Sequence, residues 1–285
     1  MKILLTGVNG QVGWELRRTL ATLGEVIAPT RAQLDLTDAT ALREFIHTTR
    51  PNVIVNPAAH TAVDKAESEP ELAHAINTVA PAVMAEAAAK LGAAMVHYST
   101  DYVFDGSKTS AYVETDTPNP LGVYGKTKLA GEQAIIASGI PHIILRTSWV
   151  YGLRGGNFLL TMQRLFRERD ALNVVNDQYG APTWSRMIAE ASAQILAQRP
   201  FLDHNGIYHL TSAGNISWYD FAQAILARTE LAAGKQVSIN PIPASQYPTP
   251  AARPVNSVLS GDKVQQTFGI IMPDWKVALD SCLAR

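Results

Sequence analysis

The fold of this 285-residue chain is decided by its N-terminal stretch, Lys2-Ile3-Leu4-Leu5-Thr6-Gly7-Val8-Asn9-Gly10-Gln11-Val12-Gly13. The apolar residues up to Thr6 predict a strand, and a helix is predicted to begin near Val12. Between them the glycines are spaced G-x-x-G-x-x-G, at Gly7, Gly10 and Gly13. Glycine permits a tight turn and a close approach of backbone to a pyrophosphate, which the first amides of a helix attract. A glycine turn in this setting indicates dinucleotide binding.

Strands and helices alternate through the first half of the chain. The apolar runs that predict strands are 3–6, 25–28, 53–56, 94–99 and 142–145. The stretches that predict helices are 12–23, 38–49 with Thr37 as N-cap, 69–90 with a kink or break at Pro81, and 123–137. Strands that are apolar on both faces and separated by helices indicate a parallel sheet covered on both sides. The predicted fold is therefore α/β, with a doubly wound parallel sheet of the Rossmann type.

After about residue 150 this alternation loosens, and Pro, Gly and Asn become frequent. Helices are expected at 158–167, 185–198, 217–231 and 275–283. We expect residues 1–150 to form the dinucleotide-binding domain and residues 151–285 to form mainly a smaller C-terminal substrate-binding lobe, with the chain free to cross between the two. Such a lobe would close over the carboxyl edge of the sheet, where ligands of these folds bind.

Composition and charge exclude several classes of protein. The formal net charge of -1 gives no electrostatic basis for binding nucleic acid or an anionic membrane. The single cysteine, Cys282, excludes an intramolecular disulfide and fits a reducing compartment. No signal peptide precedes the first predicted strand, and the longest apolar runs are too short to span a bilayer. We therefore expect a cytoplasmic protein with no membrane partner.

The residues after the second and third predicted strands indicate which cofactor binds. An acidic residue after the second strand would favour NAD, whereas an arginine suits the 2′-phosphate of NADP. This chain has Thr30 and Arg31 there, a hydroxyl and a planar cationic fork. The small residues after the third strand would let the cofactor pass, with Ala59 and Thr61 near it. NADPH is the predicted cofactor, with NADH tolerated.

A tyrosine and a lysine four residues apart carry the predicted chemistry. Tyr124 and Lys128 lie on one face of the expected helix. An ammonium beside a phenol, whose ordinary pKa is near ~10, favours its ionisation. Thr100 ends the fourth strand at the same sheet edge and can hydrogen-bond a carbonyl oxygen. These residues form a carbonyl-reduction triad: hydride comes from the nicotinamide, Tyr124 delivers the proton, Thr100 orients the carbonyl, and Lys128 tunes Tyr124 and binds the nicotinamide ribose.

Seven stretches of the chain match one known family nearly from end to end. They are GVNGQVGWE (7–15), AAHTAVDKAE (58–67), YSTDYVFDG (98–106), YGKTKLAGE (124–132), RTSWVY (146–151), NDQYGAPT (176–183) and YPTPAARPVNS (247–257). On these motifs the chain resembles the extended short-chain dehydrogenase/reductases and, within them, the dTDP-4-dehydrorhamnose reductase family. The resemblance implies NADPH-dependent reduction of the 4-keto group of dTDP-4-dehydro-L-rhamnose to give dTDP-L-rhamnose.

The resemblance also implies which residues bind cofactor and substrate. Those implied for the cofactor are Gly10, Gln11 and Val12 at the pyrophosphate, Asp35 and Leu36 at the adenine, Ala59, His60 and Thr61 along its length, and Tyr98 near the nicotinamide. Those implied for the nucleotide sugar are Thr100, Asp101, Trp149 and Arg253. Relatives often carry two arginines before the final proline, but position 252 is Ala252. Glu15 matches a position linked to a metal-bridged dimer in some relatives. Because this chain lacks an acidic C-terminal tail, no metal is expected, while a homodimer stays open.

Two other functions remain open at this point. A related nucleotide-sugar epimerase or dehydratase would use the same scaffold and recycle its cofactor within one turnover. Asp101, beside Thr100, superficially resembles the acidic residue that dehydratases add. A non-catalytic regulatory subunit of the methionine adenosyltransferase type would share the fold. Such a module need not keep Thr100, Tyr124 and Lys128 together, so their presence favours catalysis.

Overall fold

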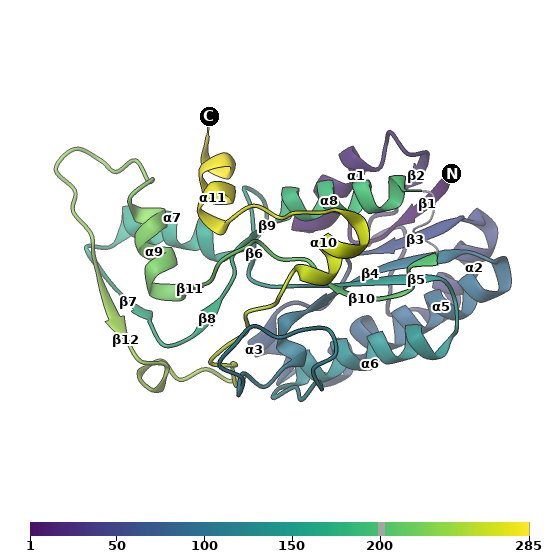
Figure 1. Cartoon of the computed structure of the whole chain (residues 1–285), viewed down its shortest axis with the longest axis horizontal. Helices are drawn as coiled ribbons and strands as arrows, with labels where there is room; N and C mark the ends of the chain where they lie inside the picture. Colours follow the sequence, from purple (N-terminus) through teal and green to yellow (C-terminus); the bar gives the residue numbers. More distant parts are fainter. Residues whose placement is uncertain (199–202, 285) are drawn as a thin grey trace.

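In the computed structural model, which describes residues 1–198 and 203–284, a six-stranded parallel sheet carries helices on both faces and a smaller lobe at one end (Figure 1). The strand order is β10 (Gly206–His209), β5 (His142–Thr147), β4 (Ala94–Thr100), β3 (Val53–Asn56), β1 (Lys2–Leu5) and β2 (Glu25–Ile27). The chain leaves β1 toward β2 and then returns to β3 on the other side. This reversal opens a crevice at the carboxyl ends of β1 and β3. The predicted doubly wound sheet is confirmed.

The helices cover the two faces as the strand pattern requires. Helices α1 (Gln11–Thr19) and α8 (Ser185–Ala197) lie on one face, and α2 (Ala39–Thr49), α5 (Ala80–Leu91) and α6 (Val123–Ala137) lie on the other (Figure 1). Of the β1 side chains, Ile3 and Leu5 pack in the core between the sheet and helices α1 and α8, and Leu4 packs in the core on the opposite face. Each such fully buried side chain stabilises the fold by about 1.5–3 kcal/mol. The sheet is therefore held from both sides.

The smaller lobe has a core of its own. Its main elements are α7 (Phe158–Glu168), β7 (Ala171–Val175), α9 (Trp218–Leu226), β12 (Ser238–Ile242) and α11 (Trp275–Leu283). Its short elements are β6 (Val150–Tyr151), β8 (Tyr179–Gly180), β9 (Thr183–Trp184) and β11 (Ile216–Ser217). The second half of the chain also returns to the sheet, where β10 extends its edge and α10 (Asp262–Phe268) packs beside it. The division at residue 150 remains a prediction.

The expected long helix over 69–90 is interrupted, but not at Pro81. Its parts are α4 (Pro70–His74), a π-helical turn η1 (Ala75–Val79) and α5. Pro81 lies in the first turn of α5 and has no amide to bind the carbonyl of Asn77 four residues earlier. That carbonyl packs instead against Gly131 of α6, where a Cβ would come within 2.2 Å of it. The π turn thus brings α5 and α6 into close contact.

Other boundaries also differ from those expected. The N-cap of α2 is Asp38, whose carboxylate accepts the amides of Thr40 and Ala41 at 3.0 and 2.9 Å. The expected cap, Thr37, donates its hydroxyl to Asp35 instead. Helices α1 and α9 end several residues earlier than predicted, and the edge strand β10 was not predicted. No helix in the described part of the chain has the length and apolarity needed to cross a membrane.

Candidate active site

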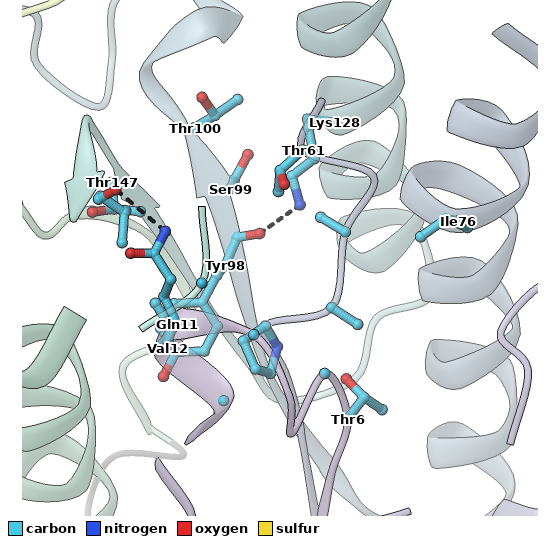
Figure 2. Close-up of a pocket in the computed structure, with 18 of the residues that line it drawn as sticks. Thr6, Gln11, Val12, Thr61, Ile76, Tyr98, Ser99, Thr100, Lys128 and Thr147 are labelled. Atoms are coloured by element: carbon cyan, nitrogen blue, oxygen red, sulfur yellow. Dashed lines mark hydrogen bonds between the residues drawn. The ribbon is translucent and has the colours of Figure 1, made fainter. Parts of the chain in front are cut away.

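A cleft of about 680 Å³ lies along the carboxyl edge of the sheet and reaches the smaller lobe. Its walls include the glycine turn, the segments after β2 and β3, the end of β4, the start of α6, and the segment that enters the smaller lobe. Figure 2 shows lining residues from the glycine turn, the segment after β3, the end of β4 and α6, among them Gln11, Thr61, Thr100 and Lys128. Of the predicted site residues, those that line the cleft are Gly7, Gly10, Gln11, Val12, Gly13, Arg31, Asp35, Leu36, Ala59, Thr61, Tyr98, Thr100, Asp101, Tyr124, Lys128 and Trp149.

The glycine turn leaves room for a phosphate group. Gly7 has a positive φ of 58°, and a Cβ on Gly13 would lie 2.1 Å from the carbonyl oxygen of Gly7. A Cβ on Gly7 would lie 2.9 Å from the backbone of Ala58, which follows β3. No side chain caps α1 at Gly10, so the first amides of this helix stay available to an anion. This cradle fits the pyrophosphate of a dinucleotide.

Arg31 lies in the segment after β2 and lines the cleft. Its side chain is 76% exposed, and its Nε lies 4.0 Å from the carboxylate of Asp35. Hydrogen bonds from the amide and hydroxyl of Thr37 hold the pKa of Asp35 below its ordinary value, so this carboxylate is ionised. The hydroxyl of Thr30, which does not line the cleft, donates to Gln33 at 3.0 Å. Arg31 therefore presents an exposed guanidinium to the cleft.

The three predicted catalytic residues meet in the middle of the cleft. Tyr124 and Lys128 extend from α6, and Thr100 ends β4. The Thr100 hydroxyl donates to Asp101 at 3.0 Å, and the Tyr124 ring packs edge-on against Tyr102 at 5.8 Å between centroids. The amide of Val123, which begins α6, donates to a carboxylate oxygen of Glu67 at 2.8 Å and fixes the start of the helix. The triad predicted from spacing is thus assembled in space.

The phenol of Tyr124 has a raised pKa rather than a lowered one. Burial raises the pKa of Tyr124 to about 12, the hydrogen bond with Thr100 opposes this shift, and the charge of Asp101 adds to it. The net shift is therefore opposite to the lowering that was expected from Lys128, because burial outweighs the effects that lower the pKa. A phenol that stays protonated at neutral pH is the form that a proton donor in a reduction needs.

The ammonium of Lys128 is directed at the end of β4. Its Nζ donates to the backbone carbonyl of Tyr98 at 2.6 Å, the dashed contact in Figure 2, and lies 3.2 Å from Nε2 of His97. Burial lowers the pKa of Lys128 to about 8, while the charge of Glu132 one turn along α6 opposes the shift. Below that pH the side chain is a buried cation.

The part of the cleft nearest the smaller lobe combines a carboxyl group with two indoles. Burial raises the pKa of Asp101 to about 7, opposed by hydrogen bonds from Ser257 and Thr100. Trp149 stacks on Trp218 of α9 with 3.4 Å between ring centroids and 5° between planes. Trp149 has a φ of 45°, a strained conformation for an aromatic residue. This strain is held by the stack and points to a functional role.

Besides Thr30, the predicted residues His60 and Arg253 do not line the cleft. The ring of His60 lies 3.1 Å from the carboxylate of Glu69, and its amide donates to the Asn77 side chain at 2.8 Å. Arg253 donates to Asp64 at 2.8 Å, so its fork is already occupied. Among the described residues no three His, Cys, Asp or Glu side chains gather as a metal site would require.

Several residues that shape the site were not predicted from the sequence. Asn77, in the π turn, joins the loop after β3 to α6 because its Nδ2 also donates to Thr127 at 3.1 Å. His97 and Trp218 also lie outside the sequence motifs from which the site was predicted. His97 did carry a signal, since it is a polar residue inside an apolar strand run that is covered on both faces.

The chain is similar over its whole length to one family of known proteins. The family model described as the RmlD substrate binding domain matches residues 1–285. A dTDP-4-dehydrorhamnose reductase from Burkholderia thailandensis is 48% identical over 292 residues, which cover 99% of this chain and 98% of that one. The structure of such a reductase from Clostridium acetobutylicum matches with a TM-score of 0.92 at 41% identity, covering 99% of this chain and 98% of that one.

A second solved structure bears on the cofactor. The dTDP-4-dehydrorhamnose reductase of Bacillus anthracis, solved in complex with NADP, matches with a TM-score of 0.91 at 33% identity, covering 99% of this chain and 98% of that one. The full-length family match, the high identities and the assembled Tyr124, Lys128 and Thr100 agree. The chain belongs to the dTDP-4-dehydrorhamnose reductases, a family of NAD(P)H-dependent oxidoreductases.

Proposed function

We propose that this protein reduces the 4-keto group of dTDP-4-dehydro-L-rhamnose with NADPH and releases dTDP-L-rhamnose. The observation that carries the proposal is the meeting of Tyr124, Lys128 and Thr100 in the same cleft as the glycine cradle. The names of the relatives and the NADP in the Bacillus anthracis structure support the same reaction.

The cofactor would lie along the cleft from Arg31 to Lys128. Arg31 would bind the 2′-phosphate, and Asp35 and Leu36 would border the adenine. The residues that would line the rest of its path are Gly7, Gly10, Gln11, Val12, Gly13, Ala59, Thr61 and Tyr98. Gln11 donates to the carbonyl of Val150 at 3.4 Å, and Asn157 of the smaller lobe donates to Gln11 at 2.9 Å. The pyrophosphate turn is thus tied to the smaller lobe.

When bound, the reduced nicotinamide supplies the hydride that the carbonyl carbon accepts. The phenol of Tyr124 gives its proton to the carbonyl oxygen as negative charge develops there. Thr100, which lines the same cleft as Tyr124, orients that oxygen. The buried ammonium of Lys128 stabilises the phenolate that Tyr124 becomes, because a cation in a low-dielectric site favours a nearby anion.

The nucleotide sugar would occupy the end of the cleft near the smaller lobe. Asp101, beside Thr100, would face the sugar hydroxyls, and the strained Trp149 would cover the ring. Arg253 does not itself line the cleft but interacts with Tyr102, which does line it. We propose that Arg253 anchors the diphosphate from this rim, at the cost of its pairing with Asp64.

A direct assay separates this function from the alternatives. The protein is mixed with NADPH and dTDP-4-dehydro-L-rhamnose, and the loss of NADPH absorbance is compared with the amount of dTDP-L-rhamnose formed. A reductase oxidises one NADPH for each product molecule. Conversion of the sugar without net oxidation would indicate an epimerase or dehydratase, and no conversion would favour a regulatory subunit.

We also propose a cytoplasmic location and keep a homodimer as a proposal. The near-zero net charge and single cysteine fit a cytoplasmic enzyme. Fractionation of cells would test the location, and sedimentation of the purified protein would test the dimer.

A further inference from the structure

A chain of buried polar side chains runs beneath the cleft from Lys128 to Thr6. Nζ of Lys128 lies 3.2 Å from Nε2 of His97, and Nδ1 of His97 lies 3.0 Å from the side-chain amide of Asn56. The same amide lies 2.6 Å from the hydroxyl of Thr6. Their exposures are 1%, 0%, 1% and 2%, so water does not compete for these bonds. The chain links α6, β4, β3 and the residue after β1.

We propose that His97 is a positioning residue that aims the ammonium of Lys128 into the active site. The proposal rests on the function proposed above, in which Lys128 acts on Tyr124 and the nicotinamide ribose. It assigns to His97 a neutral ring with the proton on Nδ1 and a lone pair on Nε2. His97 does not touch the substrate and acts only through Lys128.

When Lys128 is charged, the protons on the linked side chains of Lys128, His97, Asn56 and Thr6 have one consistent arrangement. An ammonium only donates, so Nε2 of His97 accepts and Nδ1 carries the ring proton. In the structure the Thr6 hydroxyl donates to Oδ1 of Asn56, and Nδ2 of Asn56 faces Nδ1 of His97. The proposed tautomer requires the reverse orientation of this amide, in which its oxygen accepts from Nδ1 and its NH₂ group donates to the hydroxyl oxygen of Thr6. The oxygen and nitrogen of an amide fill nearly the same space, so Asn56 can take this orientation without moving its neighbours. A proton on Nε2 would instead place two donors face to face.

The surroundings keep His97 neutral, whereas Lys128 is charged below a pKa of about 8. Burial, together with the neighbouring ammonium, holds the pKa of His97 well below its ordinary value. The nearest opposite charge on α6 is Glu132, and it is already bound to Arg146 of β5 at 2.6 Å. Lys128 therefore relies on neutral acceptors, the Tyr98 carbonyl at 2.6 Å and His97.

Two fixed acceptors determine where the third N–H of Lys128 points. One hydrogen goes to the Tyr98 carbonyl and one to His97, which leaves the third for the cleft that Lys128 lines. Figure 2 shows the Lys128 side chain reaching the end of β4, where the dashed line marks its bond to the Tyr98 carbonyl. Without the acceptor on His97, the ammonium loses a hydrogen bond that fixes its orientation and that offsets part of the free-energy cost of its burial.

A pair of variants separates positioning from packing. In His97→Gln the side-chain amide reaches about as far as Nε2 and can still accept from Lys128. In His97→Asn the side-chain amide reaches only as far as Nδ1. This variant therefore keeps the hydrogen bond with Asn56 and loses the one with Lys128. His209→Asn, at a buried histidine of β10 that is not part of this chain of residues, controls for placing an amide in the sheet.

We expect kcat to fall about ten- to hundred-fold in His97→Asn, the range for a lost hydrogen bond to a charged group. We expect His97→Gln to stay within about threefold of wild type, and His209→Asn likewise. The dissociation constant of NADPH should rise in His97→Asn and stay unchanged in His97→Gln. Equal kcat in the two His97 variants would overturn the proposal.

A second measurement needs neither substrate nor variant activity. The ¹⁵N chemical shifts of histidine-labelled wild type identify the tautomer of each ring, and the His97 signal is assigned by its absence in His97→Gln. The proposal predicts a proton on Nδ1 and none on Nε2. A proton on Nε2 would overturn it even if the protein has a different substrate, so its failure is distinct from failure of the proposed function.

Discussion

The guanidinium of Arg253 donates from Nη2 to Oδ2 of Asp64 at 2.8 Å and so joins the proline-rich segment to the helix that follows β3. Burial opposes ionisation of Asp64, but hydrogen bonds from Arg253 and the Ala251 amide hold its pKa below the ordinary value. The pair is only partly buried, with side chains 22% and 41% exposed. A solvent-accessible pair contributes little to stability. It can therefore open when a diphosphate competes for the guanidinium.

Replacing Arg253 tests where the diphosphate is held. In Arg253→Ala we expect the KM for the nucleotide sugar to rise roughly ten- to hundred-fold, because a charged hydrogen-bond partner worth about 1.5 to 3 kcal/mol is lost. The dissociation constant of NADPH should not change. Asp64→Asn, which keeps Arg253, should alter KM much less. A KM within about twofold of wild type in Arg253→Ala would place the diphosphate elsewhere.

Replacing Tyr124 tests the proton donor. Tyr124→Phe keeps the ring and removes the hydroxyl, so kcat should fall by roughly two or more orders of magnitude. Binding of NADPH, measured by fluorescence titration, should be nearly unchanged. Tyr112→Phe is the matched control, since that buried tyrosine stacks on Phe104 and lies outside the cleft. Turnover near that of wild type in Tyr124→Phe would rule out this phenol as the donor.

Much of this architecture could be predicted from the sequence because it depends on local patterns. The glycine turn and the strand runs at 53–56 and 94–99 follow from apolar periodicity and from the space that a phosphate needs. The spacing of Tyr124 and Lys128 on one helix does not depend on tertiary structure. These features were placed correctly, including the bounds of α6.

What could not be predicted depends on contacts between residues far apart in the chain. Trp149 meets Trp218 only because the smaller lobe folds back on the sheet. The raised pKa of Tyr124 reflects burial by elements that no local pattern reveals. The edge strand β10 was missed because Gly206–His209 contains only two apolar residues, Ile207 and Tyr208, and parallel pairing with β5 forms it.

Replacing Arg31 tests the choice of cofactor. Arg31→Ala should weaken NADPH binding by about 1 to 3 kcal/mol more than NADH binding, because a charge-assisted contact to the 2′-phosphate is lost. Dissociation constants for both cofactors, measured side by side, give the difference. Arg43→Ala, at another exposed arginine outside the cleft, is the control. An equal change for NADPH and NADH would make Arg31 a surface residue only.

Replacing Trp218 tests whether the indole stack holds Trp149 over the sugar. A stacked aromatic pair is worth about 0.5–1.5 kcal/mol beyond its buried area. Trp218→Leu should therefore raise the KM for the nucleotide sugar by about two- to tenfold and leave NADPH binding unchanged. If KM is unaltered while thermal stability drops, the stack serves only the core of the smaller lobe.

Asp101 should make stability depend on pH. Burial raises its pKa from 3.8 to about 7, so between these values the folded protein binds a proton that the unfolded chain has released. Stability from this group is present at low pH and is lost as pH rises through about 7. The free energy of unfolding of Asp101→Asn minus that of wild type should therefore rise by about 2 kcal/mol from about pH 5 to about pH 8. Parallel stability curves for the two proteins would contradict the raised pKa.

In the proposed reaction a hydride passes from the nicotinamide to C4 of the sugar while Tyr124 supplies the proton. The most direct measurement uses NADPH with deuterium at both C4 positions of the nicotinamide, mixed with dTDP-4-dehydro-L-rhamnose and the wild-type protein. The account predicts dTDP-L-rhamnose with one deuterium at C4 of the sugar for each NADPH oxidised. A product without deuterium at C4, or sugar conversion without NADPH oxidation, would contradict it.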